Sequence, residues 1–147
     1  MTIGPIDILL IEDNASDAEL TLHAFQKYSR TKHIHLVRDG AEALDFVHRT
    51  GAYANRDEHT LPKLILLDLK LPLVDGHYVL RQIRANPTVR HVPVVVLTSS
   101  REARDIYQSY QLGISSYIVK PVNFDAFIEA AKTIAKYWLE LNQPQVG

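Results

Sequence analysis

Acidic, hydroxyl and basic side chains stand at the ends of four apolar runs in this sequence. Glu12 and Asp13 follow "DILLI", Asp68 follows "KLILL", Thr98 ends "PVVVLT" and Lys120 follows "YIV". A single Asp at such a place often does no more than begin a turn. Three carboxylates, a hydroxyl and an ammonium together are able to bind a divalent cation and to stabilise a phosphoryl group during its transfer. Their chemistry therefore depends on a fold that brings them together.

The apolar runs alternate with amphipathic segments five times, which is typical of a parallel sheet covered by helices on both faces. We predict an α/β fold, a doubly wound five-stranded parallel sheet of the flavodoxin-like type with strand order 2-1-3-4-5. The predicted strands are 7–12, 33–37, 63–68, 93–98 and 115–119, and the predicted helices are 14–29, a short one after Gly40, 75–86, 101–112 and 123–141.

The predicted strand order makes the first and third strands neighbours, so the three carboxylates Glu12, Asp13 and Asp68 are expected to meet at one edge of the sheet. Two carboxylates about 4 Å apart repel each other by roughly 4 kcal/mol at the effective dielectric of a partly buried site. Lys120 is one candidate counter-charge, and Mg²⁺ suits an all-oxygen pocket better. An Asp nucleophile with Thr98, Lys120 and Mg²⁺ forms a phosphoryl-receiving site.

The composition favours one domain that binds neither nucleic acid nor membrane. The chain has 147 residues, 46% of them hydrophobic, so we expect a single domain over 1–147 with its core at about 6–141, a tail at 142–147 and no output domain. The 16 Lys and Arg residues nearly balance the 17 Asp and Glu residues, which leaves no basic surface for nucleic acid. The first apolar run is too short to span a membrane, and no signal-peptide pattern precedes it. We therefore expect a cytoplasmic protein.

Two further segments have plain structural interpretations. The polar segment 50–62, "TGAYANRDEHTLP", is rich in turn-forming residues, which predicts an exposed loop. His33 and His35 lie on the half-exposed second strand and are expected to point to solvent. Because the chain has no cysteine and no His-Glu-x-x-His pair, we expect no zinc site.

Four motifs together resemble the receiver domain of two-component response regulators. They are the acidic pair in "IEDN", the turn "LLDLKLPLVDG", the hydroxyl in "VVVLTSS" and the Lys-Pro pair in "YIVKPV". The resemblance runs from about residue 6 to residue 140. It implies that Asp68 accepts a phosphoryl group from a phosphohistidine on a sensor histidine kinase. It also implies a signalling phosphoprotein that catalyses only its own phosphorylation and dephosphorylation, rather than an enzyme.

The resemblance assigns metal ligands at this site. It implies that Asp13, Asp68 and the backbone carbonyl of Lys70 bind Mg²⁺ or Mn²⁺. Glu12 stands where the family more often has Asp, and the resemblance gives it a contact to the metal through water.

The resemblance also assigns residues that read the phosphoryl group. It implies that Lys120 pairs with this group and that the peptide bond from Lys120 to Pro121 is cis. It further implies that Thr98 moves to hydrogen-bond the phosphoryl group and that Tyr117 turns inward with it.

Within the family, the chain resembles the small receivers that partner bacterial and cyanobacterial phytochromes. The polar insertion at 50–62, the segment "NPTVRHVPVVVLTSS" and the ending "AKYWLELNQPQ" carry this finer resemblance. It implies a phytochrome as the sensor kinase.

Three alternatives are open to a protein with this sheet. A haloacid-dehalogenase-type phosphatase also uses an Asp nucleophile and Mg²⁺, but it needs a second Asp as general acid where this chain has Lys70. A flavin carrier would need a hydroxyl- and glycine-rich loop where "DNASDAE" offers acids. A binding module that no longer takes phosphate should have lost Asp68, Thr98 or Lys120, and all three are present.

The last predicted helix carries more apolar positions than one face against the sheet requires. We expect Tyr137, Trp138 and Leu141 to form the interface of a homodimer, since two-fold contacts are the commonest way to cover such a surface. The alternative is a wide buried stripe covered by a tail that folds back.

Overall fold

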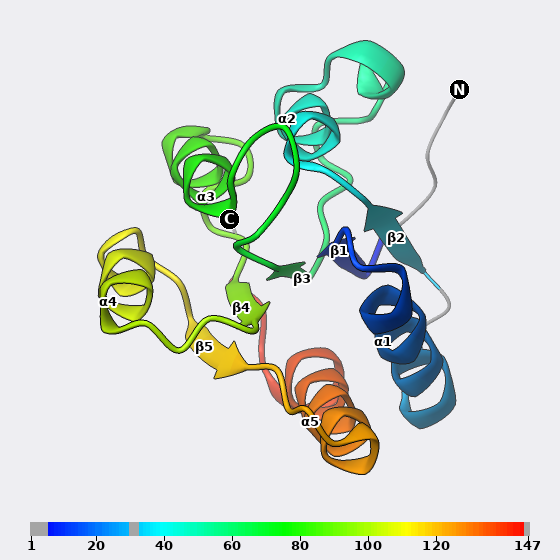
Figure 1. Cartoon of the computed structure of the whole chain (residues 1–147). Coiled ribbons are helices and arrows are strands. Elements are labelled where there is room, and N and C mark those ends of the chain that lie inside the picture. Colours follow the sequence, from blue (N-terminus) through cyan, green and yellow to red (C-terminus); the bar gives the residue numbers. More distant parts are fainter. Residues whose placement is uncertain (1–5, 30–32, 146–147) are drawn as a thin grey trace.

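The computed structural model describes residues 6–29 and 33–145, and within them it confirms the predicted fold class. Five parallel strands form one sheet in the order β2-β1-β3-β4-β5 (Figure 1). The strands are β1 Ile8–Ile11, β2 Ile34–Val37, β3 Leu64–Leu67, β4 Val94–Thr98 and β5 Ser116–Val119. The α-helices are α1 Ala15–Tyr28, α2 Gly40–His48, α3 Gly76–Ala85, α4 Ala103–Gln111 and α5 Phe124–Lys136, with a 3₁₀ turn η1 at Gly51–Tyr53 and a π-helical turn η2 at Tyr137–Leu141.

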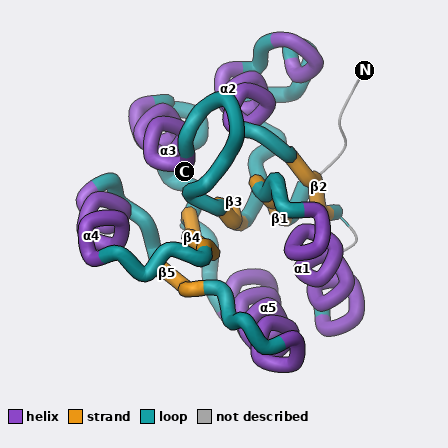
Figure 2. Tube along the Cα trace, in the orientation of Figure 1, coloured by secondary structure: helices purple, strands orange, loops and turns teal. Residues whose placement is uncertain are grey.

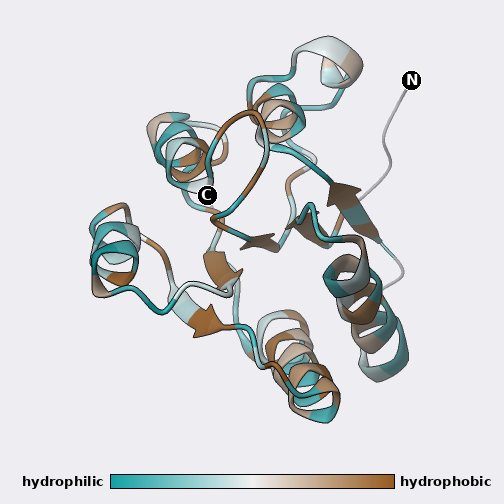
Figure 3. Ribbon diagram, viewed as in Figure 1, coloured by the Kyte–Doolittle hydropathy of each residue, from teal (hydrophilic) through white to brown (hydrophobic). Residues whose placement is uncertain are grey.

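The helices form two layers around the sheet. Helices α1 and α5 cover one face, and α2, α3 and α4 cover the other (Figures 1 and 2). Strand β3 serves both layers because successive side chains point to opposite faces: Leu66 packs into the core cluster with α1 and α5, and Leu67 packs into the cluster with α2 and α3. This explains why the central strands are hydrophobic along their whole length (Figure 3).

The register of the sheet aligns the polar strand ends. Ile11 of β1 pairs with Leu67 of β3, so the residues that follow them, Glu12 and Asp68, come level at the carboxyl edge. On the other side of β3, the backbone N–H of Lys120 donates to the carbonyl of Thr98 at 2.7 Å. Residues far apart in the chain are thereby brought to one edge.

The loop between β3 and α3 is tightly held. A Cβ atom at Gly76 would lie 2.5 Å from Cα of Leu69, and one at Gly40 would lie 2.1 Å from the carbonyl oxygen of Val74. The N–H of Val74 donates to the carbonyl of Pro72 at 2.8 Å, which makes Leu73 the central residue of a γ-turn. Leu73 has φ 72°, the rare and strained hand of this turn.

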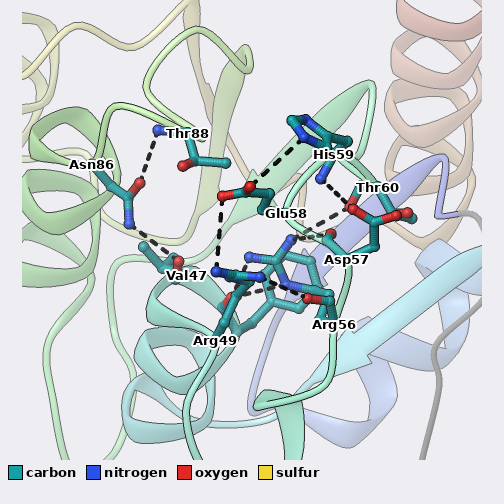
Figure 4. Close-up of polar contacts among 10 residues, drawn as sticks. Val47, Arg49, Arg56, Asp57, Glu58, His59, Thr60, Asn86 and Thr88 are labelled. Carbon is teal, nitrogen blue, oxygen red and sulfur yellow. Dashed lines mark hydrogen bonds and ion pairs between the residues drawn. The ribbon is translucent and has the colours of Figure 1, made fainter.

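The prediction of an exposed loop at 50–62 is correct for most of its residues but misses Arg56, whose side chain is buried. Figure 4 shows the polar contacts of Arg56. Nε and Nη2 of Arg56 donate to the carbonyl of Phe46 at 3.1 and 2.8 Å, and the guanidinium lies 4.3 Å from the centre of the Phe46 ring. Phe46 belongs to the last turn of α2, and its carbonyl accepts a long hydrogen bond of 3.4 Å from the backbone N–H of the capping residue Arg49. The insertion therefore adds two side-chain donors at this helix end.

The prediction for His35 is also wrong. Its ring is half-buried, packs against Phe46 and lies with Nε2 2.7 Å from the hydroxyl oxygen of Tyr53. The Tyr53 hydroxyl in turn donates to Glu42 at 2.5 Å. His33 is exposed, as predicted. The insertion thus reaches back over β2 and covers the side chain that the alternating pattern had placed in solvent.

Candidate functional site

Three carboxylates gather at the carboxyl edge of the sheet. One oxygen each of Glu12, Asp13 and Asp68 can be chosen so that all lie within 4.8 Å of one another. Glu12 and Asp68 are buried, whereas Asp13 is exposed. The expected meeting of these residues is therefore found.

The ammonium of Lys120 lies among these acids. Its Nζ atom is 2.8 Å from a carboxylate oxygen of Glu12, of Asp68 and of Asp17. Burial by itself would lower the pKa of Lys120, but hydrogen bonds to Asp17, Asp68 and Glu12 outweigh burial and raise that pKa above its ordinary value. Lys120 is thus a permanent cation in this pocket.

Asp17 is the site residue that sequence reasoning missed. It lies in the first turn of α1, three residues after Asn14, whose side-chain oxygen accepts from the Asp17 N–H at 2.9 Å. The available signal was that Asp17 is an acid in the first turn of the helix that directly follows Glu12 and Asp13. Its partner Lys120 lies 103 positions away, which no local pattern indicates.

Asp68 and Glu12 differ in their protonation. Burial tends to raise the pKa of Asp68, but hydrogen bonds from Lys120 and Glu12 hold it below its usual value. Burial and then the charge of Asp68 raise the pKa of Glu12 to about 8. Of the two carboxyl groups, Glu12 therefore holds a proton more readily, and Asp68 is the more readily ionised carboxylate, which can act as a nucleophile.

The residues predicted to read the phosphoryl group lie beside this pocket. Thr98 is fully buried at the end of β4, and its hydroxyl oxygen is 3.4 Å from the N–H of Ser100. The Tyr117 hydroxyl donates to the carbonyl of Ser100 at 3.0 Å. The Ser100 hydroxyl donates to Asp105 of α4 at 2.5 Å. Thr98 and Tyr117 are thereby both connected to the loop that leads into α4.

The prediction of a cis peptide bond between Lys120 and Pro121 is wrong. Among the described residues every peptide bond is trans, including the one from Lys120 to Pro121. Both forms are accessible before proline, because the trans form is favoured there by only about 0.5–1 kcal/mol.

Lys70 lies just after β3, two residues beyond Asp68. Its side chain is exposed, and its backbone N–H donates to the Asp68 carboxylate at 3.1 Å.

The segment predicted as a dimer interface is a π-helical turn that continues α5. Tyr137 is 47% exposed and Leu141 is 62% exposed, whereas Trp138 is half-buried against the core between α1 and α5. The rings of Tyr137 and Trp138 meet edge to face, with centres 5.0 Å apart. Part of the apolar surface is thus covered by the chain itself, and the dimer stays a prediction.

The sequence-family model of the response regulator receiver domain matches residues 8–132 of this chain. The chain belongs to this family. Its function is that of a phosphoacceptor in two-component signalling, in which receiver domains act with histidine kinases. Receiver-domain signalling proteins are generally not enzymes.

Relatives of known name agree with this membership. The probable methanogenesis regulatory protein FilR2 of Methanothrix harundinacea is 40% identical over 141 residues, which cover 95% of this chain and 87% of that protein. Response regulator Rcp1 of Synechocystis is 37% identical over 136 residues, which cover 92% of this chain and 90% of that protein.

Solved structures of receivers share the whole fold. The Mn²⁺-bound form of Rcp1 has a TM-score of 0.88 at 37% identity and covers 97% of this chain and 100% of its own. The phosphorylated cyanobacterial phytochrome response regulator RcpA has a TM-score of 0.87 at 36% identity, with the same coverage.

The acidic cluster fits a divalent cation. Glu12, Asp13 and Asp68 offer only oxygen donors, which Mg²⁺ and Mn²⁺ prefer. The relative Rcp1 has a form with Mn²⁺ bound.

Within the described residues, no helix has both the length and the apolar character needed to cross a membrane.

Proposed function

We propose that Asp68 is the phosphoacceptor and that it receives the phosphoryl group from a phosphohistidine on a sensor histidine kinase. The observation that carries this assignment is the environment of the Asp68 carboxylate. It is buried at the carboxyl end of β3, its pKa is lowered by hydrogen bonds that outweigh burial, and it lies 2.8 Å from Lys120. An ionised carboxylate beside a cation is suited to attack an anionic phosphoryl group.

The transfer exchanges one bond to phosphorus for another. An Oδ atom of Asp68 attacks the phosphorus while the bond from phosphorus to the donor's imidazole nitrogen breaks. The electron pair of that bond stays on the imidazole, which takes up a proton from solvent, and a new P–O bond forms the aspartyl phosphate. Lys120, which is already beside Asp68, donates to the phosphoryl oxygens as their charge develops.

Mg²⁺ is the cation that we propose for the acidic cluster, with Mn²⁺ as a substitute. Asp13, Asp68 and the backbone carbonyl of Lys70 would hold it, and Glu12 would contact it through water. When bound, the metal supplies positive charge that offsets the repulsion between these acids and the incoming phosphoryl oxygens. The all-oxygen donor set supports this choice.

Thr98 and Tyr117 are proposed to report the phosphorylated state. The Thr98 hydroxyl would hydrogen-bond the phosphoryl group, and Tyr117 would turn inward with it. Their shared neighbour supports this role, because Ser100 contacts both residues and is bonded to Asp105 at the start of α4. A shift of the loop at Ser100 would therefore be transmitted to α4 and to the surface around it.

We propose that this chain is cytoplasmic and that its partner is a sensor histidine kinase of the phytochrome class. The support comes from RcpA, which is a cyanobacterial phytochrome response regulator. We also propose a homodimer that uses Tyr137, Trp138 and Leu141, and a single receiver domain over 1–147 with its core at 6–141. Residues 146–147 of the predicted tail lie outside the described residues.

Phosphotransfer tests the assignment directly. Incubation of the protein with acetyl phosphate and Mg²⁺, or with an autophosphorylated phytochrome kinase, should add one phosphoryl group that is stable in acid and labile in base. Asp68→Asn should abolish this labelling, and Asp75→Asn, an acid at the start of α3, should leave it intact. Labelling that persists in Asp68→Asn would exclude Asp68 as the acceptor.

A further inference from the structure

Asp17 differs from the other two carboxylates that hold Lys120. Glu12 and Asp68 belong to the acidic cluster that fits a divalent cation, and Asp17 does not. An ammonium has three protons to donate. All three acids lie 2.8 Å from the Lys120 nitrogen, so Asp17 completes its hydrogen bonding from outside the cluster.

The position of Asp17 is fixed by the start of α1. Its N–H donates to the side chain of Asn14 at 2.9 Å, and its carbonyl accepts from the hydroxyl of Thr21 at 2.7 Å. Asn14 is the residue that caps the helix, so the Asp17 carboxylate is not needed for capping. The carboxylate instead points across to β5 and pairs with a side chain that is only 9% exposed.

The pairing matters when positive charge enters the pocket. A divalent cation held by Asp13 and Asp68 would compete with Lys120 for the Asp68 carboxylate and would repel the neighbouring ammonium. The cluster would then hold Lys120 less firmly. Asp17 lies outside the acidic cluster, so its carboxylate would remain available to the ammonium.

We propose that Asp17 is a positioning residue for phosphorylation: it retains the Lys120 ammonium beside Asp68 after the cation has bound, so that Lys120 remains available to the incoming phosphoryl group. This inference rests on the proposed role of Asp68. It gives Asp17, in the first turn of α1, a role in the reaction that the strand-end residues of the sequence did not indicate.

Acetyl phosphate is the phosphodonor for the test, because it needs no protein partner. At saturating Mg²⁺, Asp17→Asn should slow labelling about tenfold, the effect of losing one charge-assisted hydrogen bond. Asp17→Glu should restore most of the rate. Glu19→Gln is the matched control, since it removes the same charge from an exposed position of the same helix.

A double-mutant cycle shows whether Asp17 acts through Lys120. In a Lys120→Met background, Asp17→Asn should change the residual rate by less than about twofold, because the residue it positions is gone. A tenfold loss that persists in this background would overturn the proposal. So would a rate in Asp17→Asn equal to that of Glu19→Gln.

The position of the ammonium can be observed without the reaction. In the Mg²⁺-saturated wild type, the Lys120 side chain should give a proton–nitrogen correlation signal that is protected from exchange with water, and Asp17→Asn should lose it. A signal that survives in Asp17→Asn would overturn the proposal. The Asp68→Asn variant distinguishes a failure of the acceptor assignment from a failure of the Asp17 proposal. If Asp68→Asn abolishes labelling while Asp17→Asn changes neither the labelling rate nor the Lys120 signal, the acceptor assignment stands and only the role of Asp17 fails.

Discussion

The Nζ atom of Lys120 lies 2.8 Å from Oδ2 of Asp68, although 52 positions separate the two residues in the chain. Strand β4 lies between the strands that they follow, so the ion pair spans the carboxyl edge of the sheet above Thr98. The pair is the centre of a pocket that holds Glu12, Asp13 and Asp17 as well, and acids outnumber bases in it. This excess of negative charge leads to the first prediction.

Removal of divalent cations should stop phosphorylation. Because the acids repel the incoming phosphoryl oxygens by several kcal/mol, chelation should lower the rate of labelling by acetyl phosphate by at least about tenfold. Addition of Mg²⁺ or Mn²⁺ in excess should restore it. Labelling that is undiminished in EDTA would contradict the role of the metal.

Truncation of Trp138 should weaken the proposed homodimer. Burial of one large aromatic side chain at an interface contributes roughly 1.5–3 kcal/mol, so Trp138→Ala should raise the dimer dissociation constant by about tenfold or more. Sedimentation at micromolar protein, with and without phosphorylation, measures this change. Tyr107→Ala, which removes a 69% exposed aromatic ring from α4, is the matched control. A wild-type protein that is monomeric in both states would contradict the prediction.

Loss of Arg56 should destabilise the protein. Arg56→Ala leaves the carbonyl of Phe46 without its two side-chain donors and opens space beneath the insertion, which should lower the free energy of unfolding by about 2–4 kcal/mol. Thermal unfolding should show a melting temperature lower by roughly 2–4 °C per kcal/mol. Arg104→Ala, which removes an 83% exposed Arg from a surface ion pair, should change stability by less than about 0.5 kcal/mol. Equal effects of the two changes would show that Arg56 does not hold the insertion.

Relief of strain at Leu73 should stabilise the protein. Leu73 has φ 72° and is 80% exposed, so Leu73→Gly loses little packing. The strain of about 1–3 kcal/mol outweighs the roughly 0.5–1 kcal/mol of chain entropy that Gly adds, and urea unfolding should shift to higher concentration. Val122→Gly is the control, because Val122 is 98% exposed but has no positive φ. That variant should be no more stable than the wild type, and a similar gain in both would contradict the strain argument.

Stability should fall as the pH drops below about 6.5, the ordinary pKa of histidine. Burial lowers the pKa of His35, and the charge of Glu42 only partly opposes it. The unfolded chain therefore binds a proton at a higher pH than the folded protein does, so this contribution to stability is present above pH 6.5 and is lost toward the lower folded pKa. Urea unfolding at pH 7.5 and 5.5 should show a smaller pH effect in His35→Gln than in the wild type. His23→Gln, at an exposed position of α1, should behave as the wild type does.

The sequence by itself determined the fold and most of the site. Apolar runs that alternate with helical patterns dictate a parallel sheet, and the strand order then brings Glu12, Asp13 and Asp68 to one edge. Thr98 and Lys120 follow from the same logic because each ends a strand. These predictions need only local sequence patterns and the rule for strand order, and one sequence contains both.

The tertiary structure alone decided the contacts between elements whose patterns are independent of each other. Asp17 looks like an ordinary acid at the start of a helix, and only the packing of α1 against the end of β5 places it 2.8 Å from Lys120. Arg56 lies in a polar segment and His35 alternates with apolar residues on an edge strand, and both patterns predict exposure. The insertion nevertheless folds back, buries Arg56 on Phe46 and covers part of His35. The physical reason is that burial and ion pairing depend on distance in space, and no local pattern records which polar residues a distant segment will cover.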